Sequence, residues 1–435
     1  MLNCDVRDYG AKGDGVTMDT AAVQAAIDAC GARGGGRVTL AEGRYLCGRI
    51  DLRSGVELRI ERDAVLLGST NGLDFPEIES DRWLTQYGPR YNRRCFIYAE
   101  GCEDIAITGR GAIDCQGEAY IEPLPEEDAK RSNWPYVRKG FPDGFDDLGS
   151  SGLLPEQRRQ CSLSPARVVF FIGCRNVVVE DVTMRSQPSG WSYWICDCDN
   201  VHFHRAQILA SVYYPNNDGI HINCSRNVTV SDCNITCGDD GVVVRAYSAP
   251  LGRNVACEKV AVTNCNITSH SGGIRIGWYD DGTIRDCSFS NLNFTDTTVG
   301  IDMTLPDTPE GWRGSDQGTE DTLIENLTFS NITMDRIFYE PILIHAYERN
   351  RCAGIRNLYF NQIHSFSAHM PAIIGKEDCH VQNIYFTDCH FHQIDRDSIP
   401  DAEKGPNRPE QGCTIVPYFR HVDNLVMNGT VFYTK

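Results

Sequence analysis

Cys174-Arg175-Asn176-Val177-Val178-Val179 is the clearest copy of a short phrase that the chain repeats. The phrase returns 24 residues later at 198–203 (Cys-Asp-Asn-Val-His-Phe) and after a further 27 residues at 225–230 (Ser-Arg-Asn-Val-Thr-Val). Runs of four to six residues with alternating apolar positions, broken by Gly, Asn or Asp, are typical of short strands between turns. A period of about 20–30 residues is typical of one coil of a solenoid. The phrase therefore predicts stacked strands.

Weaker copies of the phrase continue toward the C-terminus and begin near residues 258, 282, 324, 354, 381 and 422. A second phrase, Asn-Ile-Thr, is interleaved with them and begins at Asn234, Asn266 and Asn331. The step between copies varies, which argues against a rigid helical repeat because turns between coils can absorb insertions. The pattern predicts an all-β fold.

The N-terminus is expected to supply a lid for the stack. Asp19 or Thr20 can cap a helix that ends at Gly31. Five apolar residues share one face of this helix: Ala22, Val23, Ala26, Ile27 and Cys30. The end of a solenoid exposes core and a strand edge, so a cap is required. Three glycines at 34–36 then turn the chain into a strand at 37–40.

Length and composition favour one large unit. A length of 435 residues would allow about three domains, but the repeat runs nearly end to end without a Pro- or Ser-rich linker. We therefore expect a single domain over 1–435, interrupted at about 121–165 by a long polar and aromatic loop without a strand pattern. The net charge of -18 argues against nucleic acid and anionic membranes as partners. No apolar run of 18 residues predicts a membrane span, and the oligomeric state stays open.

The chain contains 20 cysteines, and many occupy the same slot of the repeat, where a small apolar side chain can stack inside a coil. No CxxC pair with zinc-finger spacing occurs, so no metal site is predicted. The first strand pattern begins at Met1 with no signal peptide. We expect reduced, buried cysteines in a cytoplasmic rather than a secreted protein, although a chain trimmed of its leader would look the same.

Two acidic clusters mark the candidate site. Asn216-Asn217-Asp218-Gly219 and Gly238-Asp239-Asp240-Gly241 lie 21 residues apart, from 218 to 239, and each precedes an apolar run. A lone Asp-Gly is usually a turn. Residues one coil apart lie on neighbouring strands about 4.8 Å apart, so three carboxylates would crowd together. Such a group is costly unless it performs chemistry, and glycoside hydrolysis is the commonest chemistry for it.

The chain resembles glycoside hydrolase family 28, the polygalacturonase and rhamnogalacturonase group. The similarity lies in residues 188–191, the two acidic clusters and the segment Ser271–Gly277. Residues 5–15 and 111–114 also look like the N-terminal coils of the pectin-lyase-like superfamily. The resemblance implies a single-stranded right-handed parallel β-helix with an N-terminal capping helix. It implies a carbohydrate substrate and no metal or organic cofactor.

The resemblance also implies roles for the three carboxylates. Asp239 matches the general acid of the family, Asp218 and Asp240 match the pair that holds the attacking water, and the anomeric configuration inverts. Crowding suits this chemistry because it raises the pKa of one carboxyl while the others stay charged.

The chain departs from the polygalacturonase pattern in two places. Ser271-Gly272-Gly273 stands where those enzymes carry Gly-His-Gly, and Asp302-Met303-Thr304 stands where they carry Arg-Ile-Lys. The Arg-Ile-Lys cations recognise the galacturonate carboxylate. The Ser-Gly-Gly form is closer to the rhamnogalacturonan-cleaving branch. We therefore expect a pectin-related substrate other than plain polygalacturonan.

Alternation along the strands predicts which side chains share a column. With Ile220, Val242, Ile274 and Ile301 in the core, the next column outward is His221, Val243, Arg275 and Asp302. We expect Arg275 to face Asp302 and to replace the missing cations; the alternative is a simple surface ion pair. Trp278 can stack on a sugar or cover the core. The candidate substrate-binding residues are Asn217, His221, Arg245, Arg275, Trp278 and Asp302.

The preferred interpretation is therefore an inverting glycoside hydrolase. A β-helical polysaccharide lyase, which needs a cationic base and usually calcium, is one alternative. A non-catalytic glycan-binding β-helix is the other. The loop at 121–165 is expected to fold over the cleft and favour exo cleavage, or else to be surface decoration.

Overall fold

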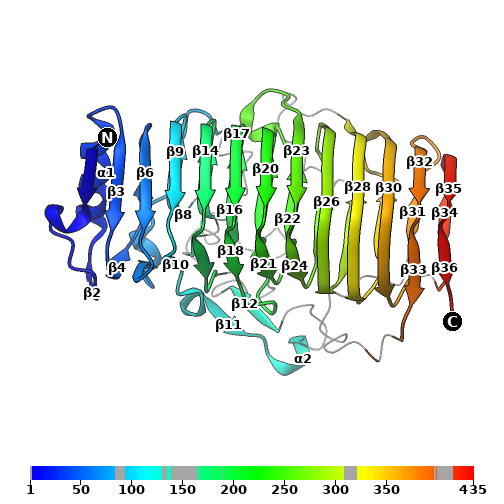
Figure 1. Cartoon of the computed structure of the whole chain (residues 1–435), viewed down its shortest axis with the longest axis horizontal. Coiled ribbons are helices and arrows are strands. Elements are labelled where there is room, and N and C mark those ends of the chain that lie inside the picture. Colours follow the sequence, from blue (N-terminus) through cyan, green and yellow to red (C-terminus); the bar gives the residue numbers. More distant parts are fainter. Residues whose placement is uncertain are drawn as a thin grey trace.

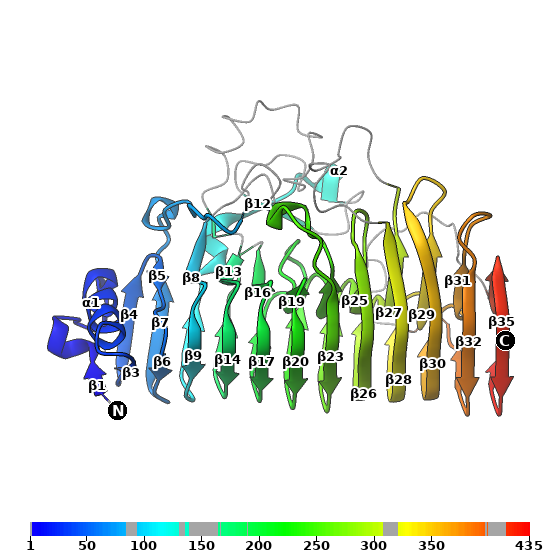
Figure 2. The same ribbon diagram turned by 90° about the horizontal axis from the view of Figure 1, so that it is seen from above.

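The computed structural model describes residues 2–83, 94–129, 135–138, 164–165, 167–188, 190–307, 321–395, 398 and 415–435. Its strands stack along one axis with the two termini at opposite ends (Figures 1 and 2). They form three rows, two in a 23-stranded sheet and one in an 11-stranded sheet, and neighbouring coils pair in parallel. The fold is the expected right-handed parallel β-helix.

The first row consists of β1 (Leu2–Asp5), β3 (Gly36–Leu40), β6 (Val56–Ile60), β9 (Glu103–Thr108), β14 (Arg175–Glu180), β17 (Asp199–His204), β20 (Arg226–Ser231), β23 (Cys257–Thr263), β26 (Thr283–Thr297), β28 (Thr322–Ile337), β30 (Cys352–Ser367), β32 (Val381–Thr387) and β35 (Val422–Asn428). The second row consists of β2 (Asp14–Met18), β4 (Gly43–Cys47), β7 (Ala64–Gly68), β10 (Ala112–Asp114), β15 (Thr183–Arg185), β18 (Gln207–Leu209), β21 (Asn234–Cys237), β24 (Asn266–Ser269), the second halves of β26, β28 and β30, β33 (His390–Gln393) and β36 (Val431–Tyr433).

The third row carries the candidate site. It consists of β5 (Ile50–Asp51), β8 (Cys95–Glu100), β13 (Arg167–Ile172), β16 (Trp191–Cys196), β19 (Ile220–Asn223), β22 (Val242–Arg245), β25 (Gly272–Ile276), β27 (Val299–Leu305), β29 (Ile342–Ala346), β31 (Ala372–Ile374) and β34 (Tyr418–Arg420). Short 3-10 helices occur at η1 (Val6–Tyr9), η2 (Gly72–Asp74), η3 (Gly117–Tyr120) and η4 (Ala249–Leu251).

The repeated phrase forms the first row, as predicted. Val177, Val201 and Val228 pair in register on successive coils and are almost fully buried. The Asn before each of them adopts a left-handed conformation, with φ of 55°, 58° and 54° at Asn176, Asn200 and Asn227. Asn tolerates this conformation better than most residues, so the phrase encodes a strand and the corner that precedes it.

The corner asparagines also bind one another. In the C-terminal half, each side-chain amide N–H donates to the side-chain oxygen Oδ1 of the Asn one coil earlier: Asn357 to Asn326, Asn383 to Asn357 and Asn424 to Asn383, each at 2.9 Å. We call this row of amides the corner ladder. It ties each coil to the previous coil at one fixed point.

Helix α1 (Thr20–Gly31) covers the N-terminal end of the core, as expected. Val23, Ala26, Ile27 and Cys30 are fully buried. The expected side-chain cap is wrong. Asp19 makes no capping hydrogen bond, because its carboxylate accepts from the backbone N–H groups of Lys12 and Gly13 at 2.7 and 2.9 Å. Thr20 Oγ1 instead accepts from the backbone N–H of Gly48 at 2.8 Å. No helix in the described ranges is both long and apolar enough to span a bilayer.

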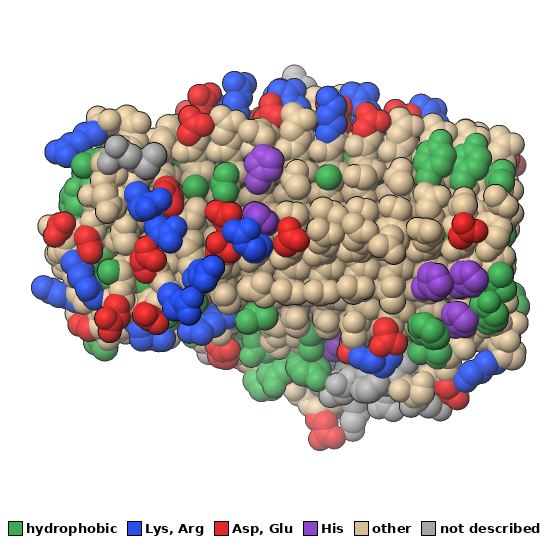
Figure 3. Space-filling model, in the orientation of Figure 1, with side chains coloured by type: hydrophobic (Ala, Val, Ile, Leu, Met, Phe, Trp, Pro, Cys, Tyr) green, Lys and Arg blue, Asp and Glu red, His purple; other side chains and the backbone are tan. Residues whose placement is uncertain are grey.

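The opposite end of the stack is less covered by the described residues. Phe419, Leu425 and Phe432 of the last coil pack on the core yet stay partly exposed. Histidines gather on the surface near this end (Figure 3), where the rings of His364 and His390 stack with centroids 4.8 Å apart. The two ends of the β-helix are therefore finished differently.

The insertion near 121–165 is only partly described, at residues 121–129, 135–138 and 164–165. The expectation that it lacks strands is wrong: β11 (Ile121–Pro123) and β12 (Tyr136–Arg138) pair in antiparallel fashion, with α2 (Glu126–Ala129) between them. A three-residue pair leaves no alternation to detect in the sequence. The ring of Tyr136 packs edge-on against Tyr214, with centroids 5.2 Å apart, so the insertion contacts the segment that precedes the first acidic cluster.

Sixteen cysteines of the described chain are free and buried, in agreement with the stacking interpretation. The expectation of reduced cysteines is wrong for one pair, because Cys352 and Cys379 form a disulfide with their Cα atoms 6.1 Å apart. That separation is usual for a disulfide.

Candidate active site

The two acidic clusters lie on the turns that lead into β19 and β22. Ile220 pairs with Val242 in parallel register, and the backbone N–H of Gly219 donates to the carbonyl of Asp240 at 2.9 Å. A Cβ at Gly219 would lie 2.3 Å from the carbonyl oxygen of Gly241. Glycine is therefore needed there, because the two turns pack against each other. The predicted stacking of the clusters is confirmed.

Asn217 binds the two turns together. Its side-chain oxygen accepts from the backbone N–H groups of Gly238 and Asp239 at 2.6 and 3.2 Å, and its amide donates to the carbonyl of Ser211 at 2.7 Å. The side chain is fully buried. These contacts join the two turns, and the predicted contact of Asn217 with substrate stays a prediction.

Asp239 is the least buried of the three carboxylates and is held by donors. Oδ2 accepts from the backbone N–H of Asn216 at 3.2 Å, and Oδ1 accepts from that of Asp240 at 2.9 Å. Burial and the neighbouring Asp240 charge raise the pKa of Asp239 to about 6, although Arg275 opposes the rise. A carboxyl with that pKa keeps its proton in mildly acidic solution.

Arg275 bridges Asp240 and Asp302. Its Nε donates to Asp240 Oδ2 at 3.0 Å, and its Nη2 lies 3.2 Å from Asp302 Oδ2. The backbone N–H of Gly272 also donates to Asp240, at 2.7 Å. The predicted column is confirmed, since Arg275 pairs with Val243 on one side and Asp302 on the other.

The bridge is buried, unlike the simple surface ion pair that was the alternative interpretation. Arg275 is 5% exposed and Asp302 is fully buried. The guanidinium lies 4.8 Å from the ring of the half-buried Trp278. Within the described residues, Nη1 of Arg275 is buried and has no hydrogen-bond partner. Asp302 also accepts from the hydroxyl of Thr304 at 2.6 Å.

Asp218 and His221 form a second buried pair. Nδ1 of His221 lies 3.3 Å from Oδ2 of Asp218, and each residue is 4% exposed. Burial, with the charges of Asp239 and Asp240, raises the pKa of Asp218 well above its usual value. Burial, with the nearby cations Arg245 and Arg167, holds the pKa of His221 well below its usual value. His221 thus contacts Asp218, and its predicted contact with substrate stays a prediction.

Arg245 follows the acid cluster along β22 and is neutralised locally. Its Nε donates to Asp281 at 2.6 Å, and its Nη2 donates to the carbonyl of Tyr279 at 3.3 Å. Asp281 is fully buried. Arg245 is thus bound mainly by the segment after β25, which was not foreseen.

Two further residues of the site were not named from the sequence as functional. The guanidinium of Arg167 lies 3.5 Å from the ring centre of Trp191. The ring of Trp191 also stacks on His221, with ring centroids 3.8 Å apart. Arg167 and Trp191 pair in register on β13 and β16. Extending the register assignment two coils toward the N-terminus, from β19 through β16 to β13, was the signal that could have found Arg167. Within the described ranges, no three His, Cys, Asp or Glu side chains are placed to bind a metal ion.

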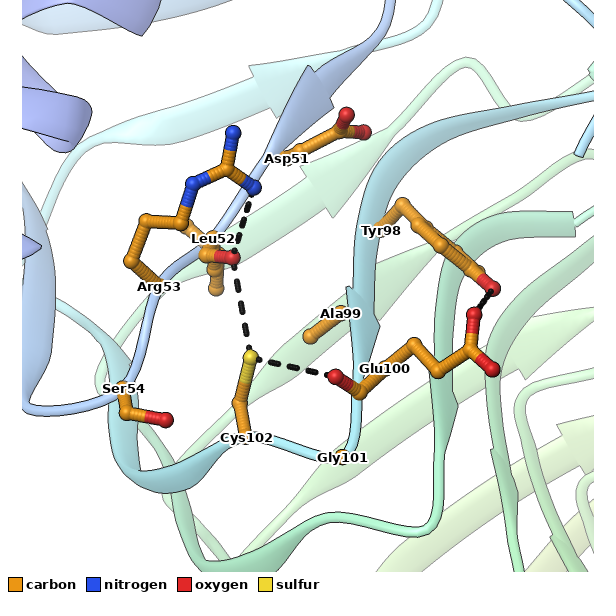
Figure 4. Close-up of a pocket in the computed structure, with 9 residues that line it drawn as sticks. All are labelled: Asp51, Leu52, Arg53, Ser54, Tyr98, Ala99, Glu100, Gly101 and Cys102. Carbon is orange, nitrogen blue, oxygen red and sulfur yellow. Dashed lines mark hydrogen bonds between the residues drawn. The ribbon is translucent and has the colours of Figure 1, made fainter. Parts of the chain in front are cut away.

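A cavity of about 260 Å³ lies elsewhere, between the segments around Leu52 and Tyr98 (Figure 4). Its polar groups are largely bonded within the protein: Tyr98 donates to Glu100 at 2.7 Å, and the Cys102 thiol lies 3.7 Å from the carbonyl of Leu52. β8, which lines it, is separated from β22 by β13, β16 and β19. The acid cluster is therefore not in this cavity.

Residues 155–392 match the model of the glycosyl hydrolases family 28, and residues 4–59 match a model described as rhamnogalacturonase A/epimerase, pectate lyase-like. An exo-poly-α-D-galacturonosidase of Dickeya chrysanthemi is 26% identical over 68% of this chain and 51% of that protein. A probable polygalacturonase of Vitis vinifera is 27% identical over 68% of this chain and 55% of that protein. The chain thus spans about half the length of these relatives.

Solved structures show the same fold. An exopolygalacturonase from Thermotoga maritima has a TM-score of 0.72 at 22% identity, covering 98% of this chain and 92% of that one. An endo-xylogalacturonan hydrolase from Aspergillus tubingensis has a TM-score of 0.61 at 17% identity, covering 96% and 98%. The matched residues 155–392 make up more than half of this chain, so the chain belongs to glycosyl hydrolase family 28.

Proposed function

We propose that this protein hydrolyses a glycosidic bond of a pectin-related glycan, with inversion at the anomeric carbon. The observation that carries the proposal is the set of three adjacent carboxyls in three different environments. Asp239 is the most exposed and has a pKa of about 6, Asp240 is paired with Arg275, and Asp218 is bound to His221. Separated environments are what an acid and a base need to coexist at one pH.

Asp239 acts as the general acid. Its protonated carboxyl gives its proton to the glycosidic oxygen as the bond to the anomeric carbon breaks. Asp218 and Asp240 hold a water on the other face of the sugar and take its proton as the new bond forms. This single displacement inverts the configuration.

The substrate we propose is related to pectin but is not plain polygalacturonan. Relatives of this chain are named for the cleavage of galacturonides, which supports a pectic glycan. Asp302 occupies the place of the cation expected in polygalacturonases, and it shares Arg275 with Asp240. A uronate carboxylate would therefore approach a cation that two carboxylates already neutralise, whereas a neutral sugar would avoid that repulsion.

We propose that the insertion closes one end of the substrate-binding cleft. β12 packs through Tyr136 against Tyr214, on the segment that leads into the first acidic cluster. We propose that the cleft is short and that the enzyme removes small units from chain ends. Random fragments released from a long polymer at early times would count against this proposal.

The experiment uses purified protein and a panel of defined pectic oligosaccharides, read by reducing ends and by mass. Hydrolysis adds one water to the products, whereas a lyase creates a double bond that absorbs in the ultraviolet. Proton NMR of the nascent sugar gives its anomeric configuration. Asp239→Asn should abolish turnover, and Asp199→Asn, a change on the opposite sheet, should leave it intact. Retained configuration, or an active Asp239→Asn, would refute the mechanism.

A further inference from the structure

His221 lies at the end of a stack of three flat side chains. The guanidinium of Arg167 lies 3.5 Å from the ring centre of Trp191, and the imidazole of His221 lies 3.8 Å from it at an interplanar angle of 19°. Two groups so close to one ring centre cannot share a face, so Trp191 is held between them. Trp194 adds an edge contact to His221, with centroids 6.1 Å apart. These contacts leave the imidazole little freedom to rotate.

The stack is built by consecutive coils. Arg167 begins β13, Trp191 begins β16 and His221 lies in β19. The backbone N–H of Ser192 donates to the carbonyl of Asp218 at 2.9 Å, which fixes the turn carrying Asp218 beside the stack. The ring position and the carboxylate position are thus set by the same strand, β16.

The two oxygens of Asp218 are in different situations. Oδ2 lies 3.3 Å from Nδ1 of His221. Oδ1 is buried and, among the described residues, has no hydrogen-bond partner. A buried carboxylate oxygen without a donor is costly, which is expected where a ligand or a water supplies the donor.

We propose that His221 is a positioning residue for hydrolysis: its Nδ1–H donates to Oδ2 of Asp218 and leaves Oδ1 to take the proton of the attacking water. This inference rests on the proposed function. In the step, the water oxygen bonds to the anomeric carbon, its proton passes to Oδ1, and the glycosidic oxygen leaves with the proton of Asp239. The donor from His221 favours the charged form of Asp218 before the proton arrives, and so opposes the burial and the neighbouring charges that raise the pKa of Asp218.

The charges around His221 support a neutral ring. Arg167 from β13 and Arg245 from β22 both disfavour a second proton on the imidazole, and burial acts in the same direction. A neutral imidazole has one N–H, and the hydrogen bond to a carboxylate selects Nδ1 as its site. The carboxyls that face this region are Asp218, Asp239 and Asp240, and the charges of the last two act on Asp218.

The first test needs no substrate. In protein labelled with ¹⁵N-histidine, side-chain NMR should show His221 as the neutral Nδ1–H form across the pH range in which the protein is folded, with the resonance identified by its loss in His221→Asn. Asp218→Asn should change its tautomer or its shift. A ring that carries its proton on Nε2, or that titrates near its ordinary pKa, would overturn the proposal.

The second test is kinetic. His221→Leu should lower kcat by about 100-fold with KM nearly unchanged, the loss typical of a misplaced reacting group. His221→Asn places an amide N–H at the position of Nδ1 and should recover most of that loss, whereas His221→Gln places it too far out and should not. Equal rates in Leu and wild type, or equal loss in Asn and Leu, would overturn the role of His221. If the wild type hydrolyses none of the oligosaccharides in the panel, the proposed function fails. The NMR result still shows whether His221 donates a hydrogen bond to Asp218.

Discussion

Asp239→Asn is expected to remove activity. It is also expected to make the protein more stable relative to the wild type at alkaline pH than it does at acidic pH. The pKa of Asp239 in the folded protein is raised from 3.8 to about 6 by burial and by Asp240. The folded state therefore holds this proton more tightly than the unfolded state does, so the stability of the wild type falls as pH rises between those two values. Each unit of pKa difference corresponds to about 1.4 kcal/mol, which gives a penalty of roughly 3 kcal/mol at pH 8. Asparagine carries no such penalty.

The assay is calorimetric unfolding of both proteins at about pH 4 and pH 8. The cost of altered hydrogen bonds at the Asn is similar at both pH values, so the comparison isolates the ionisation. The difference in Tm between variant and wild type should be more positive at pH 8 by roughly 3 °C, the shift that 2–3 kcal/mol produces in a chain of this size. Asp199→Asn is the matched control: Arg226 lowers the pKa of Asp199, so its contribution to stability is present at both pH values and the Tm difference should be nearly the same at pH 4 and pH 8. If the Tm difference between Asp239→Asn and wild type is the same at both pH values, the pKa of Asp239 is not raised in the folded protein.

Four further outcomes are expected. Arg275→Met should lower Tm by about 3–6 °C in calorimetry, because breaking a buried ion pair costs about 3–5 kcal/mol, and adding Asp302→Asn should recover part of the loss; an unchanged Tm would contradict the buried bridge. The kcat/KM of the wild type should fall about tenfold per pH unit above roughly 6, as Asp239 loses its proton, and a flat profile in initial rates would exclude it as the acid. Asn357→Ala should cost about 1–2 kcal/mol in urea unfolding through two lost hydrogen bonds and a left-handed corner, and Asn357→Gly, which loses the same hydrogen bonds but carries no left-handed strain, should separate the two causes. Tyr136→Ala should lengthen the products seen by chromatography at early times; identical products would detach the insertion from the cleft.

Alternation and a repeated phrase were enough to predict the columns of the third row. Ile220, Val242 and Ile274 pair as expected because one face of each strand is buried, and a shift of one residue would turn every apolar side chain outward. The neighbouring column of His221 and Arg275 follows from the same period of two. Sequence could therefore place these residues beside the acidic clusters.

Sequence could not give the burial or the partners of that column. Arg275 was expected on an accessible surface, yet it is enclosed by Asp240, Asp302 and Trp278, which arrive from different coils. Periodicity sets which face of a strand a side chain occupies, but segments between coils decide whether that face is covered. The partner of Arg245 was missed for this reason, since Asp281 lies 36 residues further along the chain.

The corner ladder has a consequence for how such a molecule can change over generations. Each coil of the corner ladder is bound to the one before it at a single corner by an amide pair, such as Asn383 on Asn357. The chain between one corner and the next can therefore differ in length by ten residues while the corners stay paired: 31 residues separate Asn326 from Asn357, whereas 41 separate Asn383 from Asn424. Loops between these coils can thus change in length while the strands keep their places. Loop length and strand position become separately heritable traits of one fold.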